Sequence, residues 1–205
     1  MTLLITRPYY EITTHYLFIW SEAIIQQALH DHDVHDLSKR KANKSMVESY
    51  IKKHRPNIII FKGHGNADTI TGQDGEELIS VGQNEAVLQG SKVFMRACSA
   101  GVSLGPRVVQ SGATGFIGYK DVFVFLLDQE KVHKPLEDDL AKPFLECSNE
   151  VAISLVRGNS IQQAHENSMR IYKEKIDQML TSNFATTHLL PFLHWNMINQ
   201  VYYPK

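Results

Sequence analysis

The sequence predicts an α/β fold in which a mainly parallel sheet is covered by helices on both faces. Short, nearly continuous bursts rich in Ile, Val and Phe recur along the chain, as expected of strands buried on both faces. Amphipathic segments of helical periodicity lie between them, and this alternation is typical of parallel sheets with crossover helices. The 205 residues, 43% of them hydrophobic, are enough for one full core and few for two.

The apolar bursts define the expected strands. Five are predicted with the hallmarks of buried strands, and one more is a weaker candidate: residues 3–6, 33–37, 57–62, 92–97 and 115–119, then 122–127. Residues 67–80 are expected to form a hairpin that turns at 71–75. A hairpin that follows the candidate site and a surface hairpin without any role in it explain these residues equally well.

The intervening segments define the expected helices. Residues 16–30, 44–54, 83–88 and 104–111 are predicted to cross from strand to strand, and 137–145 and 160–180 to follow the sheet. Ser160 and Gln163 have the spacing of a helix-starting capping box. The last apolar stretch, 189–203, is expected to be helical or irregular and to pack on the body.

Charge and composition exclude several classes of function. The 21 Lys and Arg against 22 Asp and Glu leave a net charge of −1, which offers no footprint for nucleic acid or a membrane surface. No apolar run approaches the roughly 20 residues of a spanning helix, and the amino terminus lacks the pattern of an export signal. The two cysteines form neither a disulfide framework nor a metal knuckle, so we expect a reducing, cytoplasmic setting.

Two strand ends carry the candidate chemistry. One is the buried run that ends in Gly63-His64-Gly65, and the other is the run that ends in Ala97-Cys98-Ser99-Ala100-Gly101. Ligands bind at the carboxyl edge of open α/β sheets, because the loops diverge there. Both reactive side chains are therefore expected at the functional edge of the sheet.

Nucleophilic acyl transfer needs a thiolate, an acid–base partner and donors for the oxyanion. Cys98 and His64 supply the first two, and the backbone amides of Gly65 and Cys98 are candidates for the donors. Taken alone, Cys98 fits a buried structural thiol and His64 a loop histidine. Their joint occurrence at two strand ends favours the catalytic interpretation.

These motifs, with Gly112 to Tyr119 as the next strand, resemble the caspase-like cysteine peptidases, in particular the CHAT (caspase and HetF-associated) branch related to gingipains, legumain and separase. The resemblance implies a three-layer αβα sandwich over residues 1–172, with residues 173–205 a helical extension packed on it. It also implies a catalytic dyad of His64 and Cys98, oxyanion donors at Gly65 and Cys98, and no metal or organic cofactor. In such peptidases the histidine is thought to protonate the leaving amine.

Arg96 is the candidate for substrate selection. It precedes Cys98 by two positions, on the same side of the strand, where the resembling peptidases line the pocket for the residue before the cut. A guanidinium there favours cleavage after Asp or Glu, with Lys120 as a second positive wall. The alternative is that Asp121, Asp128 or Glu76 neutralises Arg96 in a structural pair.

Other reactive side chains receive structural interpretations. His30, His32 and His35 alternate with acids in a short connection, which we interpret as a solvated loop and not as a zinc site. Cys147 has no histidine framed by glycines nearby and is expected to be a bystander.

The predicted function is thus a cysteine endopeptidase acting through a thioester, on a protein or peptide substrate, latent until a regulatory protein partner activates it in a defence or signalling system. The alternative is a catalytically silent scaffold or signalling subunit of the same fold. A nucleotide-binding protein is disfavoured, because no glycine-rich loop follows the first strand. The oligomeric state stays open.

Overall fold

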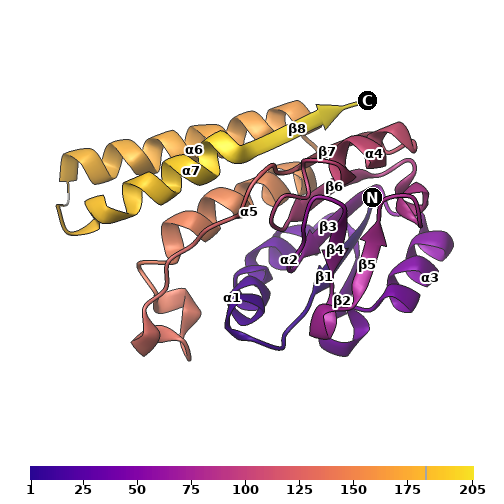
Figure 1. The fold of residues 1–205 in the computed structure, drawn as a ribbon, viewed down its shortest axis with the longest axis horizontal. Helices are drawn as coiled ribbons and strands as arrows, with labels where there is room; N and C mark the ends of the chain where they lie inside the picture. Colours follow the sequence, from indigo (N-terminus) through magenta and orange to yellow (C-terminus); the bar gives the residue numbers. More distant parts are fainter. Residues whose placement is uncertain (183) are drawn as a thin grey trace.

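The computed structural model describes residues 1–182 and 184–205 and is built on one central sheet. Its strand order is β2-β1-β3-β6-β7-β8 (Figure 1). The strands are β1 (Thr2–Arg7), β2 (Asp33–Ser38), β3 (Ile58–Lys62), β6 (Lys92–Arg96), β7 (Gly115–Tyr119) and β8 (Gln200–Pro204). All neighbouring pairs are parallel except β7 and β8. The predicted mainly parallel sheet is confirmed.

Helices cover both faces of this sheet. The elements on one face are α2 (Glu22–Ala28), α5 (Lys142–Val156) and α6 (Ile161–Ser182), with α1 (Ile12–Trp20) packed on α5. The elements on the other are α3 (Lys44–His54), α4 (Leu104–Gln110) and the hairpin of β4 (Thr69–Thr71) and β5 (Glu77–Ser80). α7 (Leu190–Asn199) runs beside α6 (Figure 1). The arrangement is a three-layer αβα sandwich.

Alternation along the strands explains the two layers. In β3, Ile59 and Phe61 pack with Val47 of α3, whereas Ile58 and Ile60 pack with Val151 of α5. Successive side chains of a strand point to opposite faces, so a continuous apolar run is needed where both faces are covered.

Local hydrogen bonding changes some predicted helices. The segment expected as one helix at 16–30 is two helices that meet at Ser21, whose hydroxyl donates to the carbonyl of Leu17 at 2.5 Å. The segment expected at 83–88 is a short 3-10 helix, Glu85–Leu88, and the one expected at 137–145 is the lead into α5.

The carboxyl-terminal part differs most from expectation. Residues 122–127 were predicted as a sixth strand but form an extended segment outside the sheet, because β8 takes the edge beside β7. Residues 173–205, predicted as a helical extension, hold the end of α6, then α7, and finish in β8, with residue 183 outside the described residues. Among the helices of the described residues, none combines the length and hydropathy needed to cross a membrane.

Candidate functional site

The candidate site lies where β3 and β6 end. Lys62 and Arg96 are the last residues of these parallel neighbours and are register partners. The loop with His64 and the loop with Cys98 therefore leave the sheet from the same edge, as parallel pairing requires.

A cavity of about 320 Å³ opens between these loops. His64 and Cys98 both line it, and Cys98 is half-buried. The remaining walls come from α1 and from the extended segment that follows β7. The other lining residues are Thr13, Leu17, Gly63, Arg96, Ala97, Val122, Phe123, Val124, Phe125 and Leu127. The structure thus brings together the predicted histidine, cysteine and arginine at one apolar cavity.

The two glycines around His64 are required by close packing. A Cβ at Gly63 would collide with the carbonyl oxygen of Thr71. At Gly65 it would lie 2.8 Å from the carbonyl oxygen of Thr69 and 3.0 Å from Cβ of Ala97. The missing side chains therefore let the His64 loop lie against both the hairpin and the Cys98 loop.

A strained turn fixes the Cys98 loop. Ser99 adopts φ of 57°, a left-handed conformation that costs free energy for a residue with a side chain. Its amide donates to the carbonyl of Asp121 at 3.1 Å, and its carbonyl accepts from the amide of Val102 at 2.9 Å. This turn redirects the chain directly after Cys98 and was not foreseen, since the sequence carries no glycine at that position.

The antiparallel bridge at Gly65 determines where its amide points. Gly65 faces Ile70 in an antiparallel bridge whose hydrogen bonds are made by its neighbours, Thr71 to His64 and Asn66 to Thr69, both at 2.9 Å. The Gly65 amide therefore points away from the hairpin. Within the described residues, neither it nor the Cys98 amide donates to a protein acceptor.

Glu11 is a site residue that the sequence analysis missed. Its carboxylate caps α1, accepting from the amide of Thr13 at 2.8 Å and from that of Thr14, and it contacts Nε2 of His64 at 3.2 Å. Partial burial works to raise the pKa of Glu11, but these hydrogen bonds outweigh it and hold the pKa below its ordinary value. Glu11 thus presents a charged acceptor to the imidazole, although 53 positions separate the two residues.

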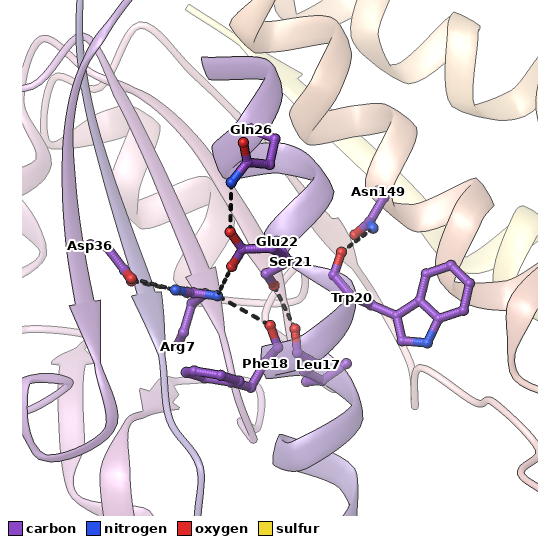
Figure 2. Close-up of polar contacts among 9 residues, drawn as sticks. All are labelled: Arg7, Leu17, Phe18, Trp20, Ser21, Glu22, Gln26, Asp36 and Asn149. Atoms are coloured by element: carbon purple, nitrogen blue, oxygen red, sulfur yellow. Dashed lines mark hydrogen bonds and ion pairs between the residues drawn. The ribbon is translucent and has the colours of Figure 1, made fainter. Parts of the chain in front are cut away.

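Arg96 lies fully buried without a counter-ion. Nη1 donates to Oδ1 of Asn149 at 2.9 Å. Figure 2 shows that Asn149 in turn donates to the carbonyl of Trp20, at 2.7 Å. Nε and Nη2 are buried with no partner, and across the described residues no carboxylate pairs with this guanidinium. The predicted alternative, neutralisation by Asp121, Asp128 or Glu76, is therefore wrong. Burial lowers the pKa of Arg96 to about 10.

The remaining predicted residues lie away from the cavity. Lys120 is exposed, is not a lining residue, and pairs through its amide with the carbonyl of Asn199 at 2.9 Å. Cys147 is buried in α5, and burial raises the pKa of its thiol. A thiol held protonated is a poor nucleophile, which agrees with its predicted bystander role.

One group of side chains has the composition of a metal site. Asp33, His35 and His54 place ligand atoms within 4.8 Å of one another on the edge strand β2 and the end of α3. Of the histidines considered in the sequence, this group contains His35. His32 lies elsewhere and bonds the carbonyl of Val156 at 2.7 Å. None of the three residues lines the cavity with Cys98.

Comparison with known proteins assigns the fold. No protein-family model and no curated protein matches the sequence. Among solved structures, the Saccharomyces cerevisiae separase–securin complex matches with a TM-score of 0.58 and 13% identity, over 99% of this chain and 11% of that chain. A secreted C11 cysteine protease from Bacteroides thetaiotaomicron, bound to an irreversible peptide inhibitor, matches with a TM-score of 0.53 and 11% identity, over 85% of this chain and 58% of that one. The protein has a caspase-like fold. It spans only a small part of the separase chain and just over half of the C11 chain.

Proposed function

We propose that the protein is a cysteine endopeptidase with Cys98 as nucleophile and His64 as general acid and base. The observation that carries this proposal is that both side chains line one cavity at the carboxyl edge of β3 and β6. The fold is shared with a C11 cysteine protease. Because fold alone does not assign activity, the support for the proposal comes from the residues of the site.

In the first half of the reaction, the Cys98 thiolate attacks the carbonyl carbon of the scissile peptide bond and a C–S bond forms. The negative charge moves to the carbonyl oxygen, where the amides of Gly65 and Cys98 stabilise it. The C–N bond then breaks, and the leaving amine takes a proton from the His64 imidazolium. The acyl group remains as a thioester on Cys98.

In the second half, water attacks the thioester carbon and gives a proton to the now neutral His64. The C–S bond breaks, the thiolate of Cys98 is regenerated, and the new carboxyl terminus leaves. Glu11 is a positioning residue, because its contact with Nε2 of His64 holds the imidazole at the cavity.

Arg96 supports a preference for Asp or Glu before the cut. It lines the cavity and has two guanidinium nitrogens without a partner. A carboxylate that enters the cavity provides the missing acceptor, and a charge-assisted hydrogen bond is stronger than a neutral one. Lys120 is not carried into this proposal, since it lies outside the cavity.

The segment after β7 supports latency. Phe123 and Phe125 pack into the apolar clusters beside the cavity, and the free nitrogens of Arg96 are shut off from solvent. Two α7 side chains hold this segment: Asn196 bonds both backbone groups of Val124, and Trp195 donates to the carbonyl of Val122 at 3.0 Å. We propose that the purified protein keeps a low basal activity, and that a protein partner raises it by releasing the segment and widening the access to Arg96.

The proposal is tested with a peptide library derived from a proteome, by sequencing the new termini that the purified protein generates. Cleavage by the parent protein, and its loss in Cys98→Ala and His64→Ala with folding unchanged by circular dichroism, is the expected result. Cys147→Ala is the matched control and should keep activity. Equal cleavage by the parent protein and Cys98→Ala refutes the proposal, and binding of a protein partner without any cleavage favours the scaffold.

A further inference from the structure

A second cation lies beside Arg96. Lys62, the last residue of β3, has no solvent exposure, and its ammonium has no hydrogen-bond partner within the described residues. Lys62 does not itself line the cavity, but it is the register partner of Arg96, which does, and neighbouring strands lie only about 4.8 Å apart. Its Nζ lies 4.9 Å from the centroid of the Phe94 ring.

Two buried cations with no anion are costly. An uncompensated buried charge costs several kcal/mol, and burial together with the charge of Arg96 lowers the pKa of Lys62 well below its ordinary value. Other residues on this face do not offset the charge. Tyr119 and Tyr172 lie near enough to Arg96 to interact with its charge, but burial raises the pKa of both hydroxyls and so disfavours their anionic forms. Helix α5 contributes only the neutral Asn149.

We infer that Lys62 and Arg96 together form an anion-binding subsite whose ligand is the side-chain carboxylate of an acidic substrate residue. Lys62 is thus a specificity-determining residue. This inference rests on the proposed function, because it places the carboxylate of the residue before the cut in the cavity that holds Cys98. The carboxylate supplies the one component that the pair lacks.

Proton exchange accompanies this binding. With the subsite empty, burial and the charge of Arg96 disfavour the ammonium form of Lys62 and lower its pKa. An entering carboxylate favours the ammonium form, so binding of an acidic side chain is expected to be accompanied by proton uptake at Lys62. A matched peptide with Gln in place of Glu meets the same lining residues, so the difference between the two peptides isolates the effect of the acidic side chain.

The first test compares Lys62→Met with the parent protein on matched peptides that differ only in Glu or Gln before the cut. The Glu-over-Gln ratio in kcat/KM is expected to fall on the order of 10- to 100-fold, the worth of a hydrogen bond to a charged group. Lys92→Met is the control, because Lys92 begins β6 at the opposite edge and bonds the carbonyl of Asn159. An unchanged ratio in Lys62→Met refutes the subsite.

The second test removes catalysis. Cys98→Ala is titrated with a peptide ending in Glu by calorimetry at pH 8, in two buffers with different ionisation enthalpies. Proton uptake that disappears in the Cys98→Ala/Lys62→Met double variant supports the inference, and uptake that persists there overturns it. Binding of the Glu peptide with uptake, but with no cleavage by the parent protein, keeps the subsite and rejects the peptidase. Cleavage by the parent protein without any preference for Glu keeps the peptidase and rejects the subsite.

Discussion

Two buried arginines at strand ends have opposite surroundings. Arg7 ends β1, and its guanidinium meets Asp36, Glu22 and the carbonyl of Phe18 (Figure 2). Burial works to lower the pKa of Arg7, but the two carboxylates outweigh it and the pKa is raised. Arg96 ends β6 with a single amide as its partner. Arg7, which links β1 to β2 and to the helices α1 and α2, is therefore neutralised, whereas the positive charge of Arg96 beside Cys98 is left uncompensated.

The largest effect should come from breaking the neutralised pair. Asp36→Asn removes the carboxylate on Arg7, whose side chain is only 7% exposed, and leaves Glu22 as its one counter-ion. We expect a loss of about 2–3 kcal/mol in the free energy of unfolding, measured by urea titration at pH 7. Asp31→Asn, at an exposed position, is the control. A loss equal to that of the control contradicts the structural role of the Arg7 pair.

The difference between these arginines also marks what the sequence could predict. Short motifs at strand ends located His64, Cys98 and Arg96, because apolar runs and glycines are local signals. Whether an arginine finds an acid depends on contacts such as Arg7 with Asp36, which are 29 positions apart. The sequence offered Asp121, Asp128 or Glu76 as acids for Arg96, but the structure places Asn149 there.

Long-range packing explains the other differences. Glu11 reaches His64 only because α1 begins beside the cavity, and no local pattern distinguishes it from an ordinary helix cap. Lys62 was predicted only as the last residue of a buried strand, and no local signal indicated that its ammonium lies buried beside Arg96. Residues 122–127 have strand-like composition, but β8 takes the place at the sheet edge from the far end of the chain. Composition predicts whether a segment is strand-like, but which of two strand-like segments pairs with β7 depends on the packing of the whole fold.

An intermediate effect of opposite sign is expected at Lys62. Because the pKa of Lys62 is lowered on folding, the unfolded chain binds the extra proton, and the stability of the parent protein rises with pH between the folded pKa and about 10.4. Lys62→Met removes this penalty and should stabilise the protein by about 1–2 kcal/mol at pH 7, with the gain shrinking toward pH 9. Urea titrations across that range measure it.

The control for Lys62 is again Lys92→Met, whose ammonium has an acceptor and whose loss should not stabilise. A Lys62→Met variant that is less stable at every pH contradicts the view of an uncompensated charge. Stabilisation combined with a lost Glu preference would show that the site retains a charge that the fold itself disfavours, as sites kept for binding often do.

The smallest effect on stability is expected at Glu11, where charge and capping coincide. Glu11→Gln keeps a side-chain oxygen for the amides of Thr13 and Thr14 but loses the negative charge at the start of α1, a change of about 0.5–1 kcal/mol. Because the folded pKa of Glu11 is lowered, its contribution is present above the unfolded pKa and disappears as the pH falls through the folded one. The parent protein and Glu11→Gln should therefore converge in stability in acid.

The same substitution separates capping from positioning of the imidazole. If Glu11 orients His64, Glu11→Gln lowers kcat on the order of tenfold with little change in KM, less than the ~10²-fold or more that proton transfer itself contributes. Ile12→Ala alters an exposed residue of the same first turn that neither lines the cavity nor touches the Glu11–His64 contact, and it serves as the control for helix integrity. An unchanged kcat in Glu11→Gln would limit Glu11 to its role as a helix cap. The uncompensated charges of Arg96 and Lys62 would then be the charges beside the cavity that remain proposed to act on the substrate.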